Sequence, residues 1–411
     1  MSVAIASKNK PVPPLARTPE EWAEAVRPLG GRAFHGKSIF RWMHARGVTD
    51  PRLMTDLPAP LREALAPLGL ERVLEVAVER RALDHTRKLL VRMQDGATVE
   101  TVLIPGVSGA KHSLPSPDGR PAAWPPRGQH PVDEDADAAA AADDEDDEGA
   151  EPASTAPIRV TQCISTQVGC AMGCVFCASG VAGLKRHMGA DEIVAQVIAG
   201  RSRLDEGEQL RNVVLMGMGE PLHNYDATVR ALKLLTHPDG IAMSSRRITV
   251  STSGLVPEIA RLGEDFAGNI GLAISLHAAD DETRSRLMPI NRKYPLAVLM
   301  AGLRAYPLPR RRRITIEYTL VAGRNDSEAE AKKLVKLLRG LPVKVNLIPM
   351  NPIEASTLGP PDMHGVLAFQ QVLVDGGYSC FIRRRRGDDV SAACGQLALL
   401  GAKPKVRVNR D

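Results

Sequence analysis

The sequence predicts an α/β protein whose main body is a partial (β/α)6 barrel, preceded by a small helical domain and a β-meander. Three observations lead to this architecture. Apolar stripes at helical spacing dominate residues 17–70, an alternation of period two follows over 71–106, and strand-like runs alternate with amphipathic helical segments over 158–400. Strands that alternate with helices are typical of parallel β/α units.

The first element after a loose N-terminus (1–16) is a helix that begins at Thr18. Thr18-Pro19-Glu20-Glu21 supplies a cap, a proline in the first turn and a glutamate at the capping-box position. A second helix is expected near Gly36 and a third over 61–68. We interpret 17–70 as a helical accessory domain whose basic face is available to RNA.

The next region, 71–106, has the alternation of a β-meander. Asp95-Gly96 predicts a tight turn between its last two strands. Glu100 lies in the final strand, and considered alone it is most simply a solvent-facing strand residue.

The composition changes completely over 107–157, which we expect to be a disordered acidic insertion. Residues 133–151 contain eleven acidic side chains and no basic one. Without them the chain has 53 basic against 37 acidic residues, a net charge of about +16. Such a charge favours a polyanionic partner such as nucleic acid, with a solubilising surface as the alternative. Because aromatic residues make up only 3% of the chain, binding would depend on charge and shape.

The barrel is expected over 158–400, with a basic tail over 401–411. Amphipathic segments separate most of its strand-like runs. Six units and a closing strand account for seven such runs: 158–164, 212–216, 247–252, 270–276, 314–321, 343–348 and 378–382. Function in such barrels gathers at the carboxyl ends of the strands.

The first of these strand ends carries four of the six cysteines within fifteen residues. Cys170, Cys174 and Cys177 form a C-x3-C-x2-C loop, and Cys163 precedes them. Three thiolates on one loop can hold three corners of a [4Fe–4S] cluster and leave the fourth iron open to S-adenosylmethionine (SAM). A structural zinc knuckle is the alternative, but zinc usually takes two separated cysteine pairs. Disulfides are disfavoured because nothing in the sequence suggests secretion.

Polar clusters follow four later strands. They are Gly217-Met-Gly219-Glu220-Pro221, Ser251-Thr-Ser-Gly254, Ser275-Leu276-His277 and Asn346-Leu-Ile-Pro-Met-Asn351. Each could be ordinary turn chemistry, yet their shared position predicts one ligand site at the mouth of the barrel.

Two further cysteines lie near the C-terminus. Cys394 follows a run of arginines over 383–386, which is either a solvated face or a grip for an anionic substrate next to a nucleophile. A basic neighbourhood also makes a thiol more reactive. Cys380 lies in an apolar strand and is expected to be an inert core residue.

These motifs together resemble the 23S rRNA (adenine-C2)-methyltransferase family of radical SAM enzymes, whose bacterial members also act on tRNA. The resemblance runs from residue 15 to 397, and only the acidic insertion interrupts it. Its most specific parts are the Glu100 strand, the cysteine loop, the Gly-Met-Gly-Glu-Pro turn and Arg386-Gly-Asp-Asp-x4-Cys394-Gly-Gln-Leu.

The resemblance implies a [4Fe–4S] cluster on Cys170, Cys174 and Cys177, with SAM as second cofactor. It implies that Cys394 carries a methyl group and that a 5′-deoxyadenosyl radical abstracts hydrogen from that group. It also implies that Glu100 accepts a proton. Cys163 would then attack the Cys394 sulfur, release the product and leave a transient disulfide. The residues that would bind SAM are Gly219, Glu220, Ser251, Ser275, Leu276, His277 and Asn351.

The partners implied are 23S rRNA, tRNA and a flavodoxin-type electron donor. We expect a monomer in the cytoplasm, without a membrane span or an export signal, because no apolar run is long enough for either. Two alternatives stay open: methylation of carbon 8 of the same rRNA adenine, and a zinc-stabilised RNA-binding protein without catalysis.

Overall fold

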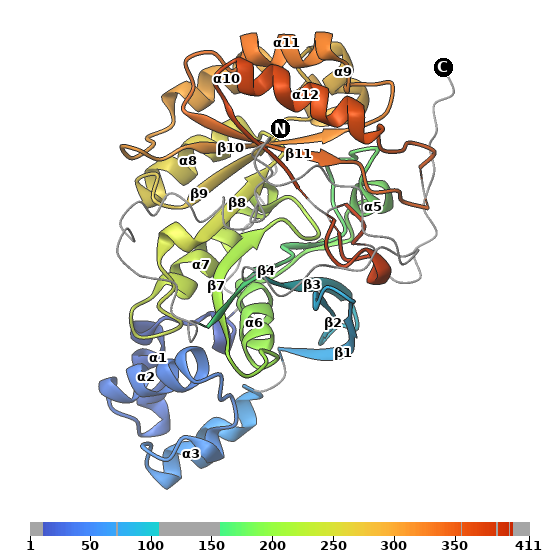
Figure 1. The fold of residues 1–411 in the computed structure, drawn as a ribbon. Helices are drawn as coiled ribbons and strands as arrows, with labels where there is room; N and C mark the ends of the chain where they lie inside the picture. The colour runs from blue at the N-terminus through green and yellow to red at the C-terminus, as the bar shows by residue number, and fades with distance from the viewer. Residues whose placement is uncertain are drawn as a thin grey trace, which may run out of the picture.

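The structure is a computed structural model of the 411-residue chain, and a ten-stranded sheet is its centre (Figure 1). The residues that it describes are 11–70, 73–106, 157–354, 356–383, 385–393 and 395–397. The predicted acidic insertion, apart from its last residue, and the predicted tail therefore lie outside the described residues.

The strand order within this sheet is β1-β2-β3-β4-β7-β8-β9-β10-β11-β12. The first three strands pair antiparallel, as the predicted meander requires, and β3 also pairs antiparallel with β4. From β4 to β12 every neighbouring pair is parallel. The strands are β1 (Leu74–Arg81), β2 (Arg87–Met93), β3 (Thr98–Pro105), β4 (Ile158–Cys163), β7 (Glu208–Leu215), β8 (Ile248–Thr252), β9 (Gly271–Ser275), β10 (Ile314–Leu320), β11 (Val343–Pro349) and β12 (Ser379–Ile382). All seven strands predicted for the barrel are confirmed.

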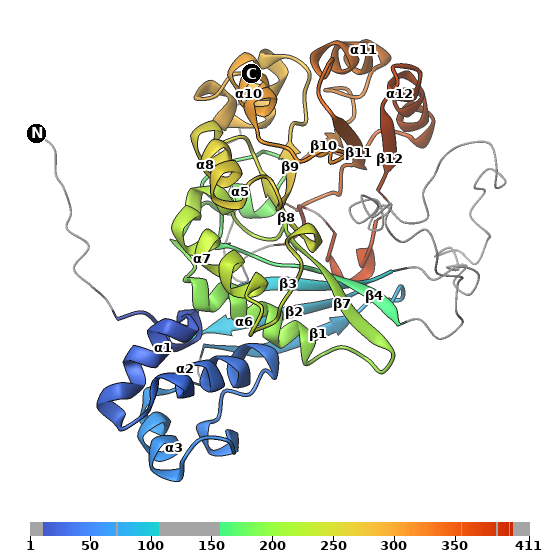
Figure 2. The same cartoon turned by 90° about the vertical axis from the view of Figure 1, so that its left-hand side faces the viewer.

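Helices between the parallel strands cover the outside of this curved sheet (Figures 1 and 2). They are α6 (Ala190–Arg201), α7 (Tyr225–Thr236), α8 (Val256–Phe266), α9 (Asp281–Leu287), α10 (Leu296–Ala305), α11 (Glu328–Leu337) and α12 (Met363–Asp375). Their buried apolar side chains join those of the strands in one large hydrophobic core, except Leu287 of α9, which packs in a smaller cluster with Phe176 and Met288. None of the helices that the structure describes has the length and hydrophobicity of a membrane span.

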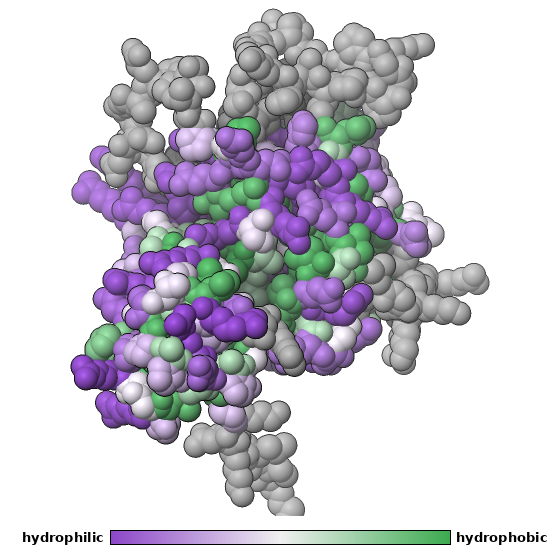
Figure 3. Space-filling view, turned by 90° about the horizontal axis from the view of Figure 1, so that it is seen from below, coloured by the Kyte–Doolittle hydropathy of each residue, from purple (hydrophilic) through white to green (hydrophobic). Residues whose placement is uncertain are grey.

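The helical domain contains α1 (Pro19–Val26), α2 (Ala33–Phe40) and α3 (Ala59–Leu65). The predicted capping box is present, since Thr18 Oγ1 accepts from the Glu21 N–H at 3.3 Å and Glu21 Oε2 accepts from the Thr18 N–H at 2.8 Å. A Cβ added at Gly36 would lie 2.3 Å from the backbone nitrogen of Ala23, so glycine allows α1 and α2 to pack closely. This domain lies at the lower end of Figure 1; seen from that end, hydrophilic side chains cover most of the surface and hydrophobic ones gather in a central hollow (Figure 3).

Two details differ from the expectation. Leu15 and Ala16, expected in a loose N-terminus, are almost fully buried, and Ala16 accepts a hydrogen bond from Arg230 Nε. A small second sheet, β5 (Gln167–Val168) with β6 (Arg186–His187), was not predicted. Strands of two residues are too short to show a hydrophobic period. This sheet closes the base of the cysteine loop.

Candidate active site

A cavity of about 160 Å³ opens at the carboxyl ends of the parallel strands. The cysteine loop forms part of its wall, residues in or just after β7, β8, β9, β10 and β11 form most of the rest, and Met288, Arg383 and Gly395 complete it. Nine of the residues predicted for the cluster and SAM lie together there: Cys170, Cys174, Cys177, Gly219, Glu220, Ser251, Ser275, His277 and Asn351. The rule that function gathers at these strand ends thus correctly predicted that these residues share one cavity.

Leu276 is the exception among the predicted SAM residues. Its side chain is fully buried in the hydrophobic core and is not part of the cavity wall. Its backbone N–H donates to the Glu317 carbonyl of the neighbouring strand. Any contact of Leu276 with a ligand in the cavity would have to use its backbone.

The cysteine loop can close only because glycine occupies position 169. Gly169 has a φ of +77°, and a Cβ there would lie 1.9 Å from the carbonyl oxygen of Gly183. That same carbonyl accepts a hydrogen bond from the Cys170 N–H at 3.2 Å. After Cys177 the chain enters the short helix α5 (Ala178–Ala182). The backbone of this turn thus directs the three thiols to one cavity.

Burial controls the protonation of these thiols. It raises the pKa of Cys170 to about 12, and it raises the pKa values of Cys174 and Cys177 as well. Binding of iron must therefore release protons from the loop. Among the described residues, no three His, Cys, Asp or Glu side chains converge closely enough to hold a single metal ion. All three thiols line one cavity, and three thiolates on one loop fit a cluster in which each binds a different iron.

Glu220 is the buried carboxylate of the site. One oxygen accepts from the Ser253 N–H at 2.7 Å and the other from the Leu222 N–H at 3.1 Å. Desolvation raises its pKa above the usual value, and these hydrogen bonds act against the shift. A ligand with an ammonium group would offset the cost of keeping this carboxylate ionised.

His277 offers a neutral ring to the same cavity. Burial lowers its pKa to about 3, and its Nδ1 accepts a hydrogen bond from the Thr319 N–H at 2.8 Å. Because Nδ1 is an acceptor, the ring carries its proton on Nε2. His277 therefore contributes a fixed donor rather than a charge.

The sequence analysis did not identify Arg284 of α9, although this side chain links the ends of β8 and β9 through hydrogen bonds. Its guanidinium is fully buried and donates to the carbonyls of Ser253, Ser275 and Leu276 and to Asn291 Oδ1, at 2.8–3.2 Å. Burial lowers its pKa to about 10, and the nearby Cys174 opposes that shift. Most residues of 281–287 are polar, so the sequence does not indicate that the Arg284 side chain is buried.

We expect Arg284→Met to lower the free energy of unfolding by about 3 kcal/mol, because three buried oxygens and one partly buried oxygen would lose their donor. Denaturant unfolding followed by circular dichroism measures it. Arg286→Met is the matched control, since Arg286 lies two residues on in the same helix, is exposed and pairs with the exposed Glu282. We expect that control to change the free energy by less than about 0.5 kcal/mol. Equal effects of the two substitutions would show that Arg284 does not tie the strand ends.

The sequence analysis also missed Glu317, which lies beside Arg383 of the arginine run. Glu317 lies in the middle of β10, is 4% exposed, and accepts a hydrogen bond from Asn346 Nδ2 at 2.9 Å. Arg383 lies 3.8 Å from it, and both residues line the cavity. The sequence did contain a signal for Glu317, because a carboxylate within a strand that is buried along its whole length often has a functional role. The interpretation of the arginine run as a solvated face is wrong for Arg383.

Glu100 does not face solvent, so that interpretation is wrong too. Glu100 is 7% exposed, and its carboxylate forms an ion pair with Lys88 Nζ at 3.0 Å. The same ammonium donates to the Ser391 carbonyl at 3.1 Å. Lys88 therefore joins β2, β3 and the C-terminal segment beside Glu100.

Cys163 ends β4 next to the Glu100 strand. It is buried, and its carbonyl accepts a hydrogen bond from Thr101 Oγ1 at 2.7 Å. Neither Cys163 nor Glu100 is part of the cavity wall that holds the three loop cysteines. Cys380 is buried in β12, and burial raises the pKa of its thiol, as an inert core residue requires.

The C-terminal segment forms hydrogen bonds with the β1–β2 turn and with the residue that follows the cysteine loop. The Gly387 N–H donates to Asp84 Oδ2 between β1 and β2, and the Gly395 carbonyl accepts from the Ala178 N–H after the cysteine loop. Gly395 also lines the cavity. Cys394 itself lies outside the described residues.

Comparisons with known proteins agree with this geometry. Residues 164–338 match the profile of the radical SAM superfamily, and residues 18–68 match that of the ribosomal RNA large subunit methyltransferase N-terminal domain. The chain is 67% identical over 400 residues to the dual-specificity RNA methyltransferase RlmN of Sorangium cellulosum, covering 97% of this chain and 99% of that protein. It is 41% identical to the RlmN of Syntrophobacter fumaroxidans over 92% and 94% of the two chains. A crystal structure of a radical SAM methyltransferase from Sphaerobacter thermophilus superposes with a TM-score of 0.78 at 39% identity, over 94% of this chain and 99% of that one.

Proposed function

Because the chain belongs to the radical SAM family of dual-specificity RNA methyltransferases, we propose that it methylates carbon 2 of a specific adenine in 23S rRNA and of an adenine next to the anticodon in tRNA. The observation that carries this proposal is the shared cavity at the strand ends. The cysteine loop, the polar strand ends and Gly395, the chain neighbour of Cys394, all line it.

Cys170, Cys174 and Cys177 would hold a [4Fe–4S] cluster. The radical SAM match spans all three, which supports this interpretation over a zinc knuckle. When bound, the cluster supplies the electron that turns SAM into a source of a carbon-centred radical. Glu220 would accept hydrogen bonds from the ammonium group of SAM. Gly219, Ser251, Ser275, His277, Asn351 and the backbone of Leu276 would bind the rest of that molecule.

Cys394 would carry the methyl group to the base, because carbon 2 of adenine is not nucleophilic and cannot attack a sulfonium. A hydrogen atom of the S-methyl group of Cys394 would pass to the 5′-deoxyadenosyl radical, and the methylene carbon would then join carbon 2. Glu100 would accept the proton from carbon 2. Cys163 would attack the Cys394 sulfur, so that the bond between this sulfur and the methylene carbon breaks and a Cys163–Cys394 disulfide forms. The released carbon would take up a proton to become the methyl group, and the one electron left over would return to the cluster. The ion pair with Lys88 holds Glu100 beside residue 391 and so supports its assignment.

Methylation at carbon 8 would use the same cysteines and stays the second candidate. The match of residues 18–68 to an rRNA methyltransferase domain favours carbon 2, since recognition of two RNA classes goes with that domain. Mass spectrometry of rRNA and tRNA nucleosides from cells with and without this protein tests the proposal. We expect 2-methyladenosine in both RNA classes only when the protein is present; 8-methyladenosine would establish the alternative.

The remaining partners stay predictions. A flavodoxin-type electron donor would reduce the cluster, and a monomer in the cytoplasm would meet both RNAs. Reconstitution with a purified flavodoxin system tests the donor.

We expect deletion of 108–156, with a short Gly/Ser bridge, to leave turnover on an RNA fragment within a few-fold of the full chain. Pro105 and Val160 are directly paired across β3 and β4, and the Gly106 N–H donates to the Arg159 carbonyl at 2.7 Å, so a short connection suffices. Single-turnover methylation measures the effect. A folded deletion variant without any activity would show that the segment takes part in catalysis.

A further inference from the structure

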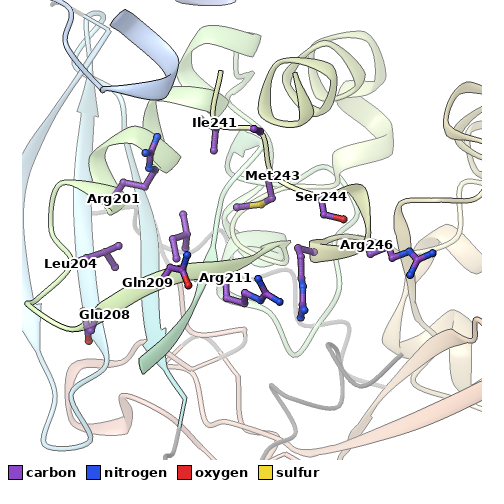
Figure 4. A pocket seen from close by; sticks show the side chains of 12 residues that line it. Arg201, Leu204, Glu208, Gln209, Arg211, Ile241, Met243, Ser244 and Arg246 are labelled. Atoms are coloured by element: carbon purple, nitrogen blue, oxygen red, sulfur yellow. The ribbon is translucent and has the colours of Figure 1, made fainter. Parts of the chain in front are cut away.

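A second cavity, of about 850 Å³, lies at the opposite ends of the strands (Figure 4). The end of α6, the first half of β7 and the segment that leads into β8 line it, and it shares no wall residue with the candidate active site. From Arg211 to Leu215, the last residue of β7, the chain spans about 13 Å at the rise of an extended strand, and Gly217 of the active-site cavity lies two residues further on. Only an extended ligand could touch this cavity and the active-site mouth together.

Arginine dominates the lining. Arg201 and Arg246 lie at opposite ends of the view in Figure 4, with Arg211 between them, and Arg247 also lines the cavity. The carboxylate in this wall, Glu208, is already paired with the fully buried Arg87 and accepts from the Asp205 N–H at 2.8 Å. The charge presented to a ligand is therefore positive.

Arg211 is the most informative of these side chains. Its Nε is buried and has no hydrogen-bond partner among the described residues. A buried donor without an acceptor is costly, and an anionic oxygen from a ligand would remove that cost. The planar guanidinium matches phosphate oxygens particularly well.

The cavity also adjoins the helical domain. Arg201 donates to the carbonyls of His44 and Ala45 at 2.9 Å each. Lys37 and Arg41 of that domain pair with Asp239, just before the segment that lines the cavity. An RNA that contacts residues 18–68 would thus meet the arginines at this junction.

We propose that this arginine-lined cavity binds the sugar–phosphate backbone of the substrate RNA, at the opposite end of the barrel from the methylated adenine. The proposal rests on the proposed function, because it takes RNA as the substrate. Leu204, Ile241 and Met243 add an apolar wall for the sugars. Such contacts position the RNA without reading its sequence.

The test measures the affinity of the full-length protein for a labelled tRNA transcript over a series of KCl concentrations. We expect Arg211→Gln to weaken binding about tenfold at low salt and to make the slope of log affinity against log salt shallower by about one. Arg211→Lys keeps the charge and should keep the slope. Arg304→Gln, which removes an exposed charge on α10, is the matched control and should change neither quantity.

Methylation of the same tRNA by the unchanged protein is measured alongside, so that the two proposals can fail separately. If that protein methylates the tRNA but Arg211→Gln and Arg304→Gln bind it alike, the cavity proposal alone is overturned. Thermal unfolding checks the fold, and Arg246→Gln, at an exposed position, is the second variant if Arg211→Gln unfolds. Binding of a synthetic peptide of residues 133–151 is measured with the same proteins. If Arg211→Gln weakens binding of this acidic peptide but leaves binding of the tRNA unchanged, the cavity takes an acidic segment and the proposal is overturned.

Discussion

Cys174→Ala is expected to leave the anaerobically purified protein without its iron–sulfur cluster and to reduce adenine methylation to background. The three loop thiols share one cavity, so loss of one removes a corner of the cluster that no other described side chain there can replace. Iron and sulfide analysis, the visible absorbance of the cluster, and methylation of an RNA fragment measure the result.

Cys380→Ala is the matched control for this substitution. Cys380 is more deeply buried than Cys174, but it lies in β12 outside the cavity wall, and its carbonyl oxygen accepts a hydrogen bond from Gln370 Nε2. We expect this variant to keep its iron and most of its activity. Full cluster content in Cys174→Ala, or a zinc ion in the unchanged protein, would overturn the cluster assignment.

Cys163→Ala and Cys394→Ala are expected to abolish methylation in different ways. Cys394→Ala has no methyl carrier and should form no covalent species with RNA. Cys163→Ala should load the methyl group, attack the base and then stall with RNA attached through Cys394. Denaturing gels show the adduct as a slow band that ribonuclease removes, and peptide mapping locates the attachment.

The double variant Cys163→Ala/Cys394→Ala controls this experiment. The adduct of the single Cys163 variant must disappear in it if Cys394 is the attachment point. If both single variants are inactive without any adduct, the methyl-carrier mechanism is wrong and only a generic radical SAM activity remains.

Much of the fold could be predicted because its signals are local. The capping box at Thr18, the Asp95-Gly96 turn and the strand-like runs depend on residues close together in the chain, and each is confirmed. The polar strand ends were found because parallel strands place their carboxyl ends at one edge. Six of the seven predicted SAM residues line the cavity, and Leu276 does not.

The rest depends on tertiary contacts that the sequence does not display. Glu100 turns inward because Lys88 and the Ser391 carbonyl meet it there, and these partners lie 12 and 291 residues away. Arg284 likewise looks like a surface arginine until its four acceptors are known. Alternation in a strand indicates two faces but not which of them the rest of the chain covers.

The central claim, that a methyl group reaches carbon 2 of adenine through Cys394, is tested most directly with SAM that carries a trideuterated methyl group. The protein is reacted anaerobically with a tRNA transcript, and the product nucleosides are identified by mass spectrometry. We predict 2-methyladenosine with two deuteriums, because one is removed from the Cys394 S-methyl group before transfer. A product with three deuteriums would contradict this account, since it would show direct transfer of an intact methyl group.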